Sequence, residues 1–124
     1  MQEATRKPDV RADAHFRLGV DLGGTKIEIV ALDAARREHL RLRVPSPRDD
    51  YGATLAAIAA LVADAEHQLG VVPGTTSVGI GTPGSLARAT GLLRGSNSVW
   101  LNGHPLARDL EAALARPVRT APAR

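Results

Sequence analysis

An adjacent pair of glycines, Gly23 and Gly24, lies between two strand-like stretches and constrains the fold more than any other feature. Residues 17–22 and 26–32 are rich in Val, Leu and Ile. Polar and apolar residues alternate at the start of the second stretch, which is typical of a half-buried hairpin strand. The alternation returns over residues 39–44 and ends at a proline. Three consecutive strands, the first two joined by the glycine turn, predict an antiparallel meander.

A helix, a strand, a second helix and a last strand are predicted after the meander. Apolar residues repeat at helical spacing from position 55 to position 69, behind a candidate N-cap aspartate at 49 or 50 and ahead of Gly70. Residues 77–80 predict a buried strand followed by a Gly/Pro/Ser-rich loop, residues 105–115 a second helix, and Pro117 the start of a last strand. This order indicates an α/β domain with a mixed five-stranded sheet, the pattern of one lobe of the ribonuclease-H-like fold of actin and hexokinase ATPases.

Charge and composition argue against several classes of protein. The net charge is +3, but the basic residues are scattered among acidic ones, so we expect no nucleic-acid partner. The chain has no cysteine, which excludes disulfides and thiolate metal sites. Residues 1–15 are polar and predict a disordered tail. No signal-like stretch and no run of about 20 apolar residues is present, so we expect no membrane association and a cytoplasmic location.

The glycine turn carries the clearest chemical signal in the sequence. Adjacent glycines let a backbone approach a ligand closely, and successive free N–H groups can form a concavity that holds an anion. Thr25 adds a hydroxyl, and Asp21 offers a carboxylate that can hold magnesium through water. The alternative is a purely structural hairpin in which Asp21 is a turn residue. A Walker-type loop is excluded because its spacing of glycine, lysine and serine or threonine is absent.

A second glycine-rich segment imitates a dinucleotide-binding motif. Residues 79–84 match G-x-G-x-x-G formally and follow a predicted strand. In a dinucleotide fold the next residues open a helix whose N–H groups face the pyrophosphate. Here Pro83 removes one N–H donor, the next residues predict a loop, and no acidic residue lies about 20 positions further on. We therefore reject that interpretation.

Three segments in this order resemble the ROK family (repressors, open reading frames and kinases). Residues 21–26, Asp-Leu-Gly-Gly-Thr-Lys, are similar to its phosphate motif, and residues 78–86 to its sugar-side loop. The third segment, residues 95–103, is similar to the fructokinase branch of the family, and residues 45–51 fit that branch too. The resemblance covers roughly residues 17–119, and residues 16–124 are interpreted as the N-terminal lobe of such a kinase.

The resemblance implies an ATP-dependent hexose kinase, closest to a fructokinase, that transfers the γ-phosphoryl group of MgATP to the sugar 6-hydroxyl. The residues expected at the ATP phosphates are Asp21, with magnesium through water, and Gly23, Gly24, Thr25 and Lys26. The residues expected at the sugar are Gly81, Gly84, Ser85 and Asn97. Without the resemblance, Asn97 would be interpreted as a turn-capping side chain. Trp100 either forms a platform beside the sugar or fills the core.

The resemblance also shows what this chain lacks. An Asn-Asp-Ala signature, whose aspartate is the catalytic base, is expected after Arg119, where the chain instead reads Thr-Ala-Pro-Ala-Arg. No catalytic residue is therefore assigned, and we expect a truncated chain that is inactive alone. The second lobe would carry the structural zinc site and most of the nucleotide pocket, and the intact enzyme could be a homodimer. The alternatives are a non-catalytic sugar-binding or interaction module and, less favoured because only 20 residues precede Asp21, a ROK transcriptional regulator.

Overall fold

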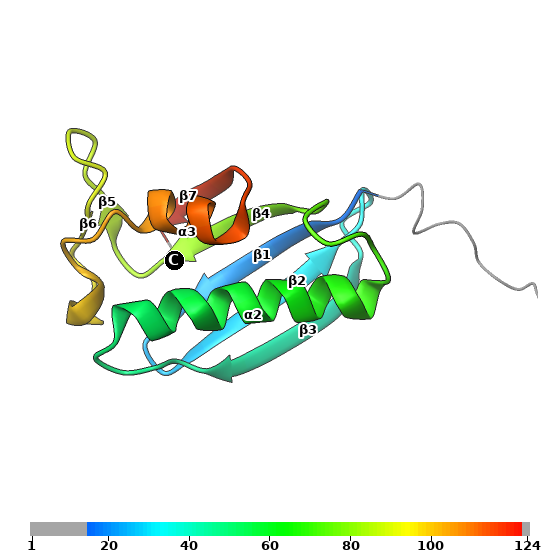
Figure 1. The fold of residues 1–124 in the computed structure, drawn as a ribbon, viewed down its shortest axis with the longest axis horizontal. Coiled ribbons are helices and arrows are strands. Elements are labelled where there is room, and N and C mark those ends of the chain that lie inside the picture. The colour runs from blue at the N-terminus through cyan, green and yellow to red at the C-terminus, as the bar shows by residue number, and fades with distance from the viewer. Residues whose placement is uncertain (1–14, 123–124) are drawn as a thin grey trace, which may run out of the picture.

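The computed structural model describes residues 15–122, which form a five-stranded mixed sheet in the order β3-β2-β1-β4-β7 (Figure 1). Strands β1 (Arg17–Leu22), β2 (Lys26–Leu32) and β3 (Glu38–Pro45) pair antiparallel, as the meander predicted. Strands β4 (Ser77–Thr82) and β7 (Val118–Pro122) extend the sheet in parallel beyond β1. The mixed five-stranded sheet predicted from the sequence is thus confirmed. The interpretation of residues 1–15 as a tail falls almost wholly outside the described residues.

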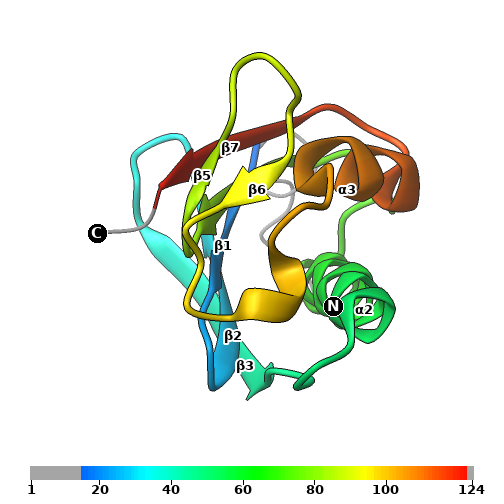
Figure 2. The same cartoon turned by 90° about the vertical axis from the view of Figure 1, so that its left-hand side faces the viewer.

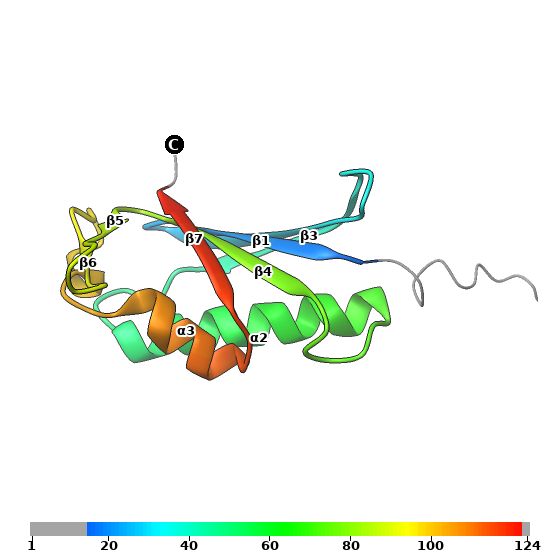
Figure 3. The same ribbon diagram turned by 90° about the horizontal axis from the view of Figure 1, so that it is seen from above.

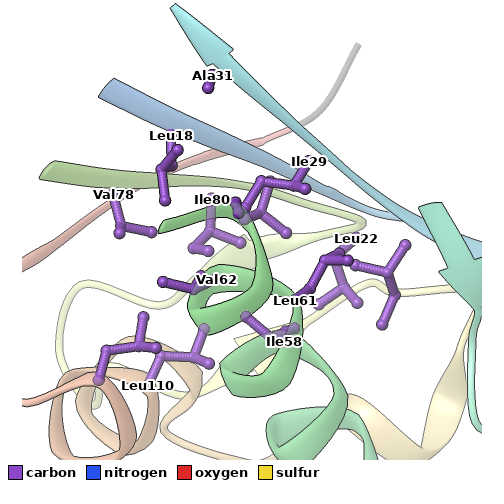
Figure 4. Packing of buried hydrophobic residues seen from close by; sticks show 14 of the residues in the cluster. Leu18, Leu22, Ile29, Ala31, Ile58, Leu61, Val62, Val78, Ile80 and Leu110 are labelled. Atoms are coloured by element: carbon purple, nitrogen blue, oxygen red, sulfur yellow. The ribbon is translucent and has the colours of Figure 1, made fainter. Parts of the chain in front are cut away.

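Both long helices pack on one face of the sheet. Helices α2 (Tyr51–Leu69) and α3 (Leu106–Leu114) lie below the sheet in Figure 3, and no described element covers the other face. The strands alternate in burial, so that every second residue points toward the helices. The close-up in Figure 4 shows the resulting core between sheet and helices, and its labelled residues are Leu18, Leu22, Ile29, Ala31, Ile58, Leu61, Val62, Val78, Ile80 and Leu110.

Helix α2 begins and ends where the sequence signals predict. The carboxylate of Asp50 accepts a hydrogen bond of 2.9 Å from the Ala53 N–H, which caps the first turn. Gly70 ends the helix with φ of 73°, a left-handed conformation that glycine adopts without the Cβ penalty. No helix in the described part of the chain is long and apolar enough to cross a membrane.

A buried ion pair joins α2 to the sheet at the end where β4 and β7 begin. Glu66 is only 2% exposed, and its carboxylate accepts a 2.9 Å hydrogen bond from Arg116 and a 2.7 Å bond from the Thr76 hydroxyl. Burial alone would raise the pKa of Glu66, but the bonds from Arg116, Thr76 and the Gly74 N–H outweigh it and hold that pKa below its usual value. Glu66 therefore stays ionised in the fold and connects three segments that are distant in sequence.

The segment after β4 contains structure that the sequence analysis missed. Where only a loop was expected, β5 (Ser85–Leu86) and β6 (Leu93–Arg94) pair antiparallel, and a single 3₁₀ turn, η1 (Val99–Leu101), follows. These short elements gather at one end of the main sheet, beside the first turn of α2 and the β1–β2 turn (Figure 2). The hairpin was missed because two-residue strands are too short to show a period in the sequence.

Candidate functional site

The turn between β1 and β2, residues 23–25, presents main-chain donors and is called here the glycine turn. The Gly23 N–H donates to the Lys26 carbonyl over 3.0 Å and closes the hairpin. The N–H groups of Gly24 and Thr25 have no hydrogen-bond acceptor among the described residues. A β-carbon on Gly23 would lie 2.8 Å from the Lys26 carbonyl oxygen, so this closure requires glycine. Two free, adjacent N–H groups at an exposed turn are suited to an anion.

Asp21 lies at the end of β1 next to the glycine turn and points away from the helices. It is exposed, and its register partners are Glu28 of β2 on one side and Gly81 of β4 on the other. An open cavity of about 750 Å³ lies on this uncovered face, and Asp21, Gly81 and Gly79 line part of it. The predicted phosphate residue Asp21 and the predicted sugar residue Gly81 are thus brought side by side at the carboxyl ends of two parallel strands, where ligands of open α/β sheets bind.

The donor set at Asp21 fits magnesium only in one mode of binding. No group of three or more metal-binding side chains occurs within residues 15–122. Glu28, the register partner of Asp21, is paired with Arg41 and Arg43, so Asp21 is the carboxylate left to offer beside the free N–H groups of the turn. One such carboxylate suits an ion that keeps most of its waters, which is how Mg²⁺ commonly binds. A site enclosed by protein ligands, such as structural zinc requires, is not formed by these residues.

The segment that follows β4 depends on a close backbone approach at Gly84. A β-carbon on Gly84 would lie 2.2 Å from the Arg94 carbonyl oxygen and 3.0 Å from the Ser96 nitrogen. The hydroxyl of Thr82 donates to the Gly84 carbonyl over 2.6 Å. Ser85 then pairs with Arg94 in the small hairpin. No helix opens after β4, which confirms the rejection of a dinucleotide-binding motif here.

The Asn102 side chain makes two hydrogen bonds across residues 95–103, called here the 95–103 loop. The Asn102 carbonyl oxygen accepts from the Ser96 N–H over 2.9 Å, and its amide donates to the Ser96 carbonyl over 3.1 Å. Asn97, between these clamped residues, is exposed, and no hydrogen bond of its side chain occurs within the described chain. A β-carbon on Gly24 would lie 3.4 Å from the Ser98 hydroxyl oxygen. The glycine turn and the loop that carries Asn97 therefore touch.

Aromatic side chains connect residues 100–109 to Arg48 and to the first residue of α2, Tyr51. The Arg48 guanidinium lies 5.8 Å from the centre of the Trp100 ring, and Trp100 packs partly buried against the core. The Tyr51 ring stacks on His104 at 3.7 Å, while its hydroxyl donates to Asp109 over 2.7 Å. Burial, together with the adjacent Asp109 carboxylate, raises the pKa of Tyr51 well above its ordinary value. The buried indole N–H of Trp100 has no acceptor in the described residues, and both interpretations of this side chain stay predictions.

Ser46 contributes to the site and was missed in the sequence analysis. It follows β3, and its hydroxyl donates to the Gly23 carbonyl over 2.7 Å. Its N–H donates to the Thr25 carbonyl over 3.0 Å. Two sequence signals pointed to this segment without naming Ser46: the resemblance of residues 45–51 to the fructokinase branch, and the flanking Pro45 and Pro47, which restrict the backbone on both sides.

Comparison with known proteins identifies the family of the chain. The chain matches the ROK family over residues 17–122, and it belongs to that family. It is 45% identical over 101 residues to an N-acetyl-D-glucosamine kinase of Salmonella paratyphi A, covering 82% of this chain and 32% of the relative. The chain therefore spans about a third of the length of the curated relatives it matches.

Solved structures agree with the fold. A ROK glucokinase from Streptomyces griseus in complex with glucose and AMPPNP superposes with a TM-score of 0.73 at 27% identity, covering 86% of this chain and 33% of that one. A ROK hexokinase from Thermus thermophilus gives a TM-score of 0.66 at 29% identity over 86% and 34% of the two chains. These likenesses confirm the predicted actin- and hexokinase-like lobe.

Proposed function

We propose that this chain forms the phosphate- and sugar-binding half of an ATP-dependent sugar kinase. The observation that carries the proposal is the contact between two groups of different chemistry. The glycine turn offers free N–H groups at Gly24 and Thr25 beside the exposed Asp21 carboxylate. The adjoining loop offers the exposed, unpaired amide of Asn97 next to Ser98. A phosphate and a sugar hydroxyl bound at these two places would be neighbours, as phosphoryl transfer requires.

The residues divide the binding between charge and hydroxyl recognition. The Gly24 and Thr25 N–H groups, the Thr25 hydroxyl and Lys26 bind the terminal phosphates, and Asp21 would hold magnesium through water. Magnesium supplies neutralisation of the phosphate charge. Asn97 and Ser85, with the main chain at Gly81 and Gly84, bind the sugar hydroxyls. An amide can both donate to and accept from a hydroxyl, which suits Asn97 to this role.

The sugar substrate is proposed as a hexose or an N-acetylated hexosamine. The matched relatives are an N-acetyl-D-glucosamine kinase and a glucokinase crystallised with glucose and AMPPNP. The resemblance of residues 95–103 to fructokinases favours fructose, but none of these relatives is a fructokinase. Binding of fructose, glucose and N-acetylglucosamine should therefore each be measured.

We expect binding without turnover from the 124-residue chain. Strand β7 carries Thr120, Ala121 and Pro122, and none of these side chains can accept the proton of an attacking hydroxyl as a carboxylate would. The chain also spans only about a third of its relatives. Phosphoryl transfer by the purified chain, abolished in Asp21→Asn, would contradict this expectation.

Binding can be measured by isothermal calorimetry on the chain, with each sugar alone and with AMPPNP and magnesium. We expect millimolar or tighter binding of one sugar and of the nucleotide, with the nucleotide weakened about tenfold in Asp21→Asn, the equivalent of about 1.4 kcal/mol. Asp64→Asn serves as the matched control, because Asp64 is an exposed aspartate on α2 whose carboxylate bonds only to Gln68. Sugar binding without nucleotide binding would favour the non-catalytic sugar-binding module, and absence of both would refute the half-site.

A further inference from the structure

Ser46 binds the two carbonyl groups that flank Gly24. The Ser46 hydroxyl donates to the Gly23 carbonyl at 2.7 Å, and the Ser46 N–H donates to the Thr25 carbonyl at 3.0 Å. Both bonds reach across from the end of β3 to the glycine turn, over 23 positions in the case of the hydroxyl. One residue outside the turn therefore fixes a carbonyl on each side of the residue that offers a free N–H.

The Gly23 carbonyl is diverted from the partner that it would have in an ordinary hairpin. A tight turn commonly closes with a hydrogen bond from the N–H of its fourth residue to the carbonyl of its first. Here the Gly23 N–H donates to Lys26, but the Gly23 carbonyl accepts from Ser46, and no bond to it from the Lys26 N–H occurs in this turn. The orientation of the peptide between Gly23 and Gly24 thus depends on the Ser46 hydroxyl.

Because a peptide group is planar, the bond from Ser46 to the Gly23 carbonyl also sets the direction of the Gly24 N–H. A trans peptide is planar, and its C=O and N–H point in opposite directions. The Gly23 carbonyl and the Gly24 N–H belong to one peptide, so a carbonyl held toward Ser46 turns the Gly24 N–H to the opposite side. A peptide between two glycines is the least restricted in the chain and would otherwise sample other orientations. Donation to the carbonyl also polarises the peptide and strengthens its N–H as a donor.

We propose that Ser46 is a positioning residue that aims the Gly24 N–H at the bound phosphate. It acts through the peptide between Gly23 and Gly24 and does not itself touch the ligand. This role rests on the proposed function of the glycine turn as a phosphate site. It also connects that site to the segment leading into α2, since Arg48, two residues further on, lies against Trp100 of the 95–103 loop.

The test uses the ¹⁵N-labelled 124-residue chain and two readouts. Residual dipolar couplings report the direction of the Gly24 N–H without any ligand, and a titration with tripolyphosphate reports the affinity of the turn. In Ser46→Ala we expect a changed Gly24 coupling and about tenfold weaker tripolyphosphate binding, the effect of one well-made hydrogen bond. Ser46→Thr, which keeps the hydroxyl, should stay within about twofold of the original affinity.

The control is Thr75→Ala, which removes a hydroxyl bond of 2.6 Å to the Val72 carbonyl in the loop between α2 and β4, away from the glycine turn. It should change neither readout. If Ser46→Ala gives no folded spectrum, Ser46→Thr and Ser46→Val supply the same comparison, because these side chains share a shape and differ in the hydroxyl. In that pair the valine variant should show the changed coupling and the weaker binding.

Two results would overturn the proposal in different places. An unchanged Gly24 coupling in Ser46→Ala, or in Ser46→Val relative to Ser46→Thr, would show that Ser46 does not orient this peptide. A coupling that changes and is restored by threonine, with no binding of millimolar tripolyphosphate to the original chain, would support the peptide geometry. That second result would contradict the phosphate site and, with it, the role of Ser46 toward phosphate.

Discussion

The glycine turn and the 95–103 loop hold neighbouring parts of one site by different means. The turn joins β1 and β2, and each of these strands has a partner on both sides in the five-stranded sheet. The loop follows the two-residue strand β6 and is held by the Asn102 clamp and by close packing at Gly84. The strands that flank the phosphate donors are thus fixed by the whole sheet, and Ser46 holds the Gly23 carbonyl within the turn, while the 95–103 loop depends on a few local bonds. Substitutions that change these local bonds leave the sheet intact. We therefore expect the residues that set sugar preference among relatives to differ mainly in this loop.

The largest expected effect tests whether the glycine turn and the 95–103 loop both depend on the stability of the same core. In Glu66→Gln the partly buried Arg116 loses its charged partner while keeping its bond to the Thr76 carbonyl, and we expect a loss of about 3 kcal/mol in the free energy of unfolding. Glu66 and Arg116 belong to neither the glycine turn nor the 95–103 loop, so their loss should lower the stability of the whole domain. Hydrogen exchange should therefore accelerate equally in β1 and at Ser96. Glu28→Gln is the matched control, since Glu28 pairs with Arg41 and Arg43 on the exposed face and its loss should be much smaller.

The same residue gives the chain a pH dependence of known sign. Against the effect of burial, hydrogen bonds from Arg116, Thr76 and Gly74 hold the folded pKa of Glu66 below its unfolded value, so its contribution to stability is fully present at any pH above that unfolded value. It is lost as the pH falls from there through the folded pKa. Urea unfolding between pH 7 and pH 3 should therefore show a stability gap between the original chain and Glu66→Gln that narrows toward acid. A gap that is independent of pH would mean that Glu66 contributes by packing and not by its charge.

A smaller effect separates the two regions. In Gly84→Ala the new β-carbon would lie 2.2 Å from the Arg94 carbonyl, so the backbone must shift, at a cost of about 2 kcal/mol. The shift should appear as changed amide signals throughout the 95–103 loop, with the β1–β2 ladder unmoved. Gly79→Ala is the control, because its β-carbon would meet nothing closer than 3.9 Å. Equal changes in the two regions would contradict the independence of loop and turn.

The difference between periodic elements and long-range contacts also explains which parts of the structure were predictable from the sequence. The sheet, α2 and the glycine turn were predictable because alternation, caps and an adjacent glycine pair are periodic or local signals. The bond from Ser46 to Gly23 was not, because it joins residues 23 positions apart and nothing in either segment alone specifies it. The buried pair of Glu66 and Arg116 was missed for the same reason, as 50 positions separate its members.

The next effect concerns the clamp within the loop. Asn102→Ala leaves the N–H and the carbonyl of buried Ser96 without their partner, and we expect a loss of about 1.5 kcal/mol. Hydrogen exchange at the Ser96 amide should accelerate more than in any residue of β1. In Asn102→Asp the acceptor for the Ser96 N–H is kept while the donor is lost, so its loss should be smaller than that of the alanine variant. A larger loss in the aspartate variant would mean that the uncharged amide matters more than the acceptor.

The smallest effect on stability should be the most specific for function. Asn97 is exposed and makes no bond within the described chain, so Asn97→Ala should change the free energy of unfolding by less than about 0.5 kcal/mol. If its amide binds a sugar hydroxyl, calorimetry should show sugar affinity reduced about tenfold while nucleotide affinity is kept. Asn102→Ala, in contrast, should lower sugar affinity and stability together. Unchanged sugar affinity in Asn97→Ala would mean that another residue of the loop contacts the sugar and that Asn97 has no role in sugar binding. A loss of stability in Asn97→Ala would instead show that Asn97 is one of the residues that hold the loop in place. The loop would then depend on local contacts even at the residue proposed to bind the sugar.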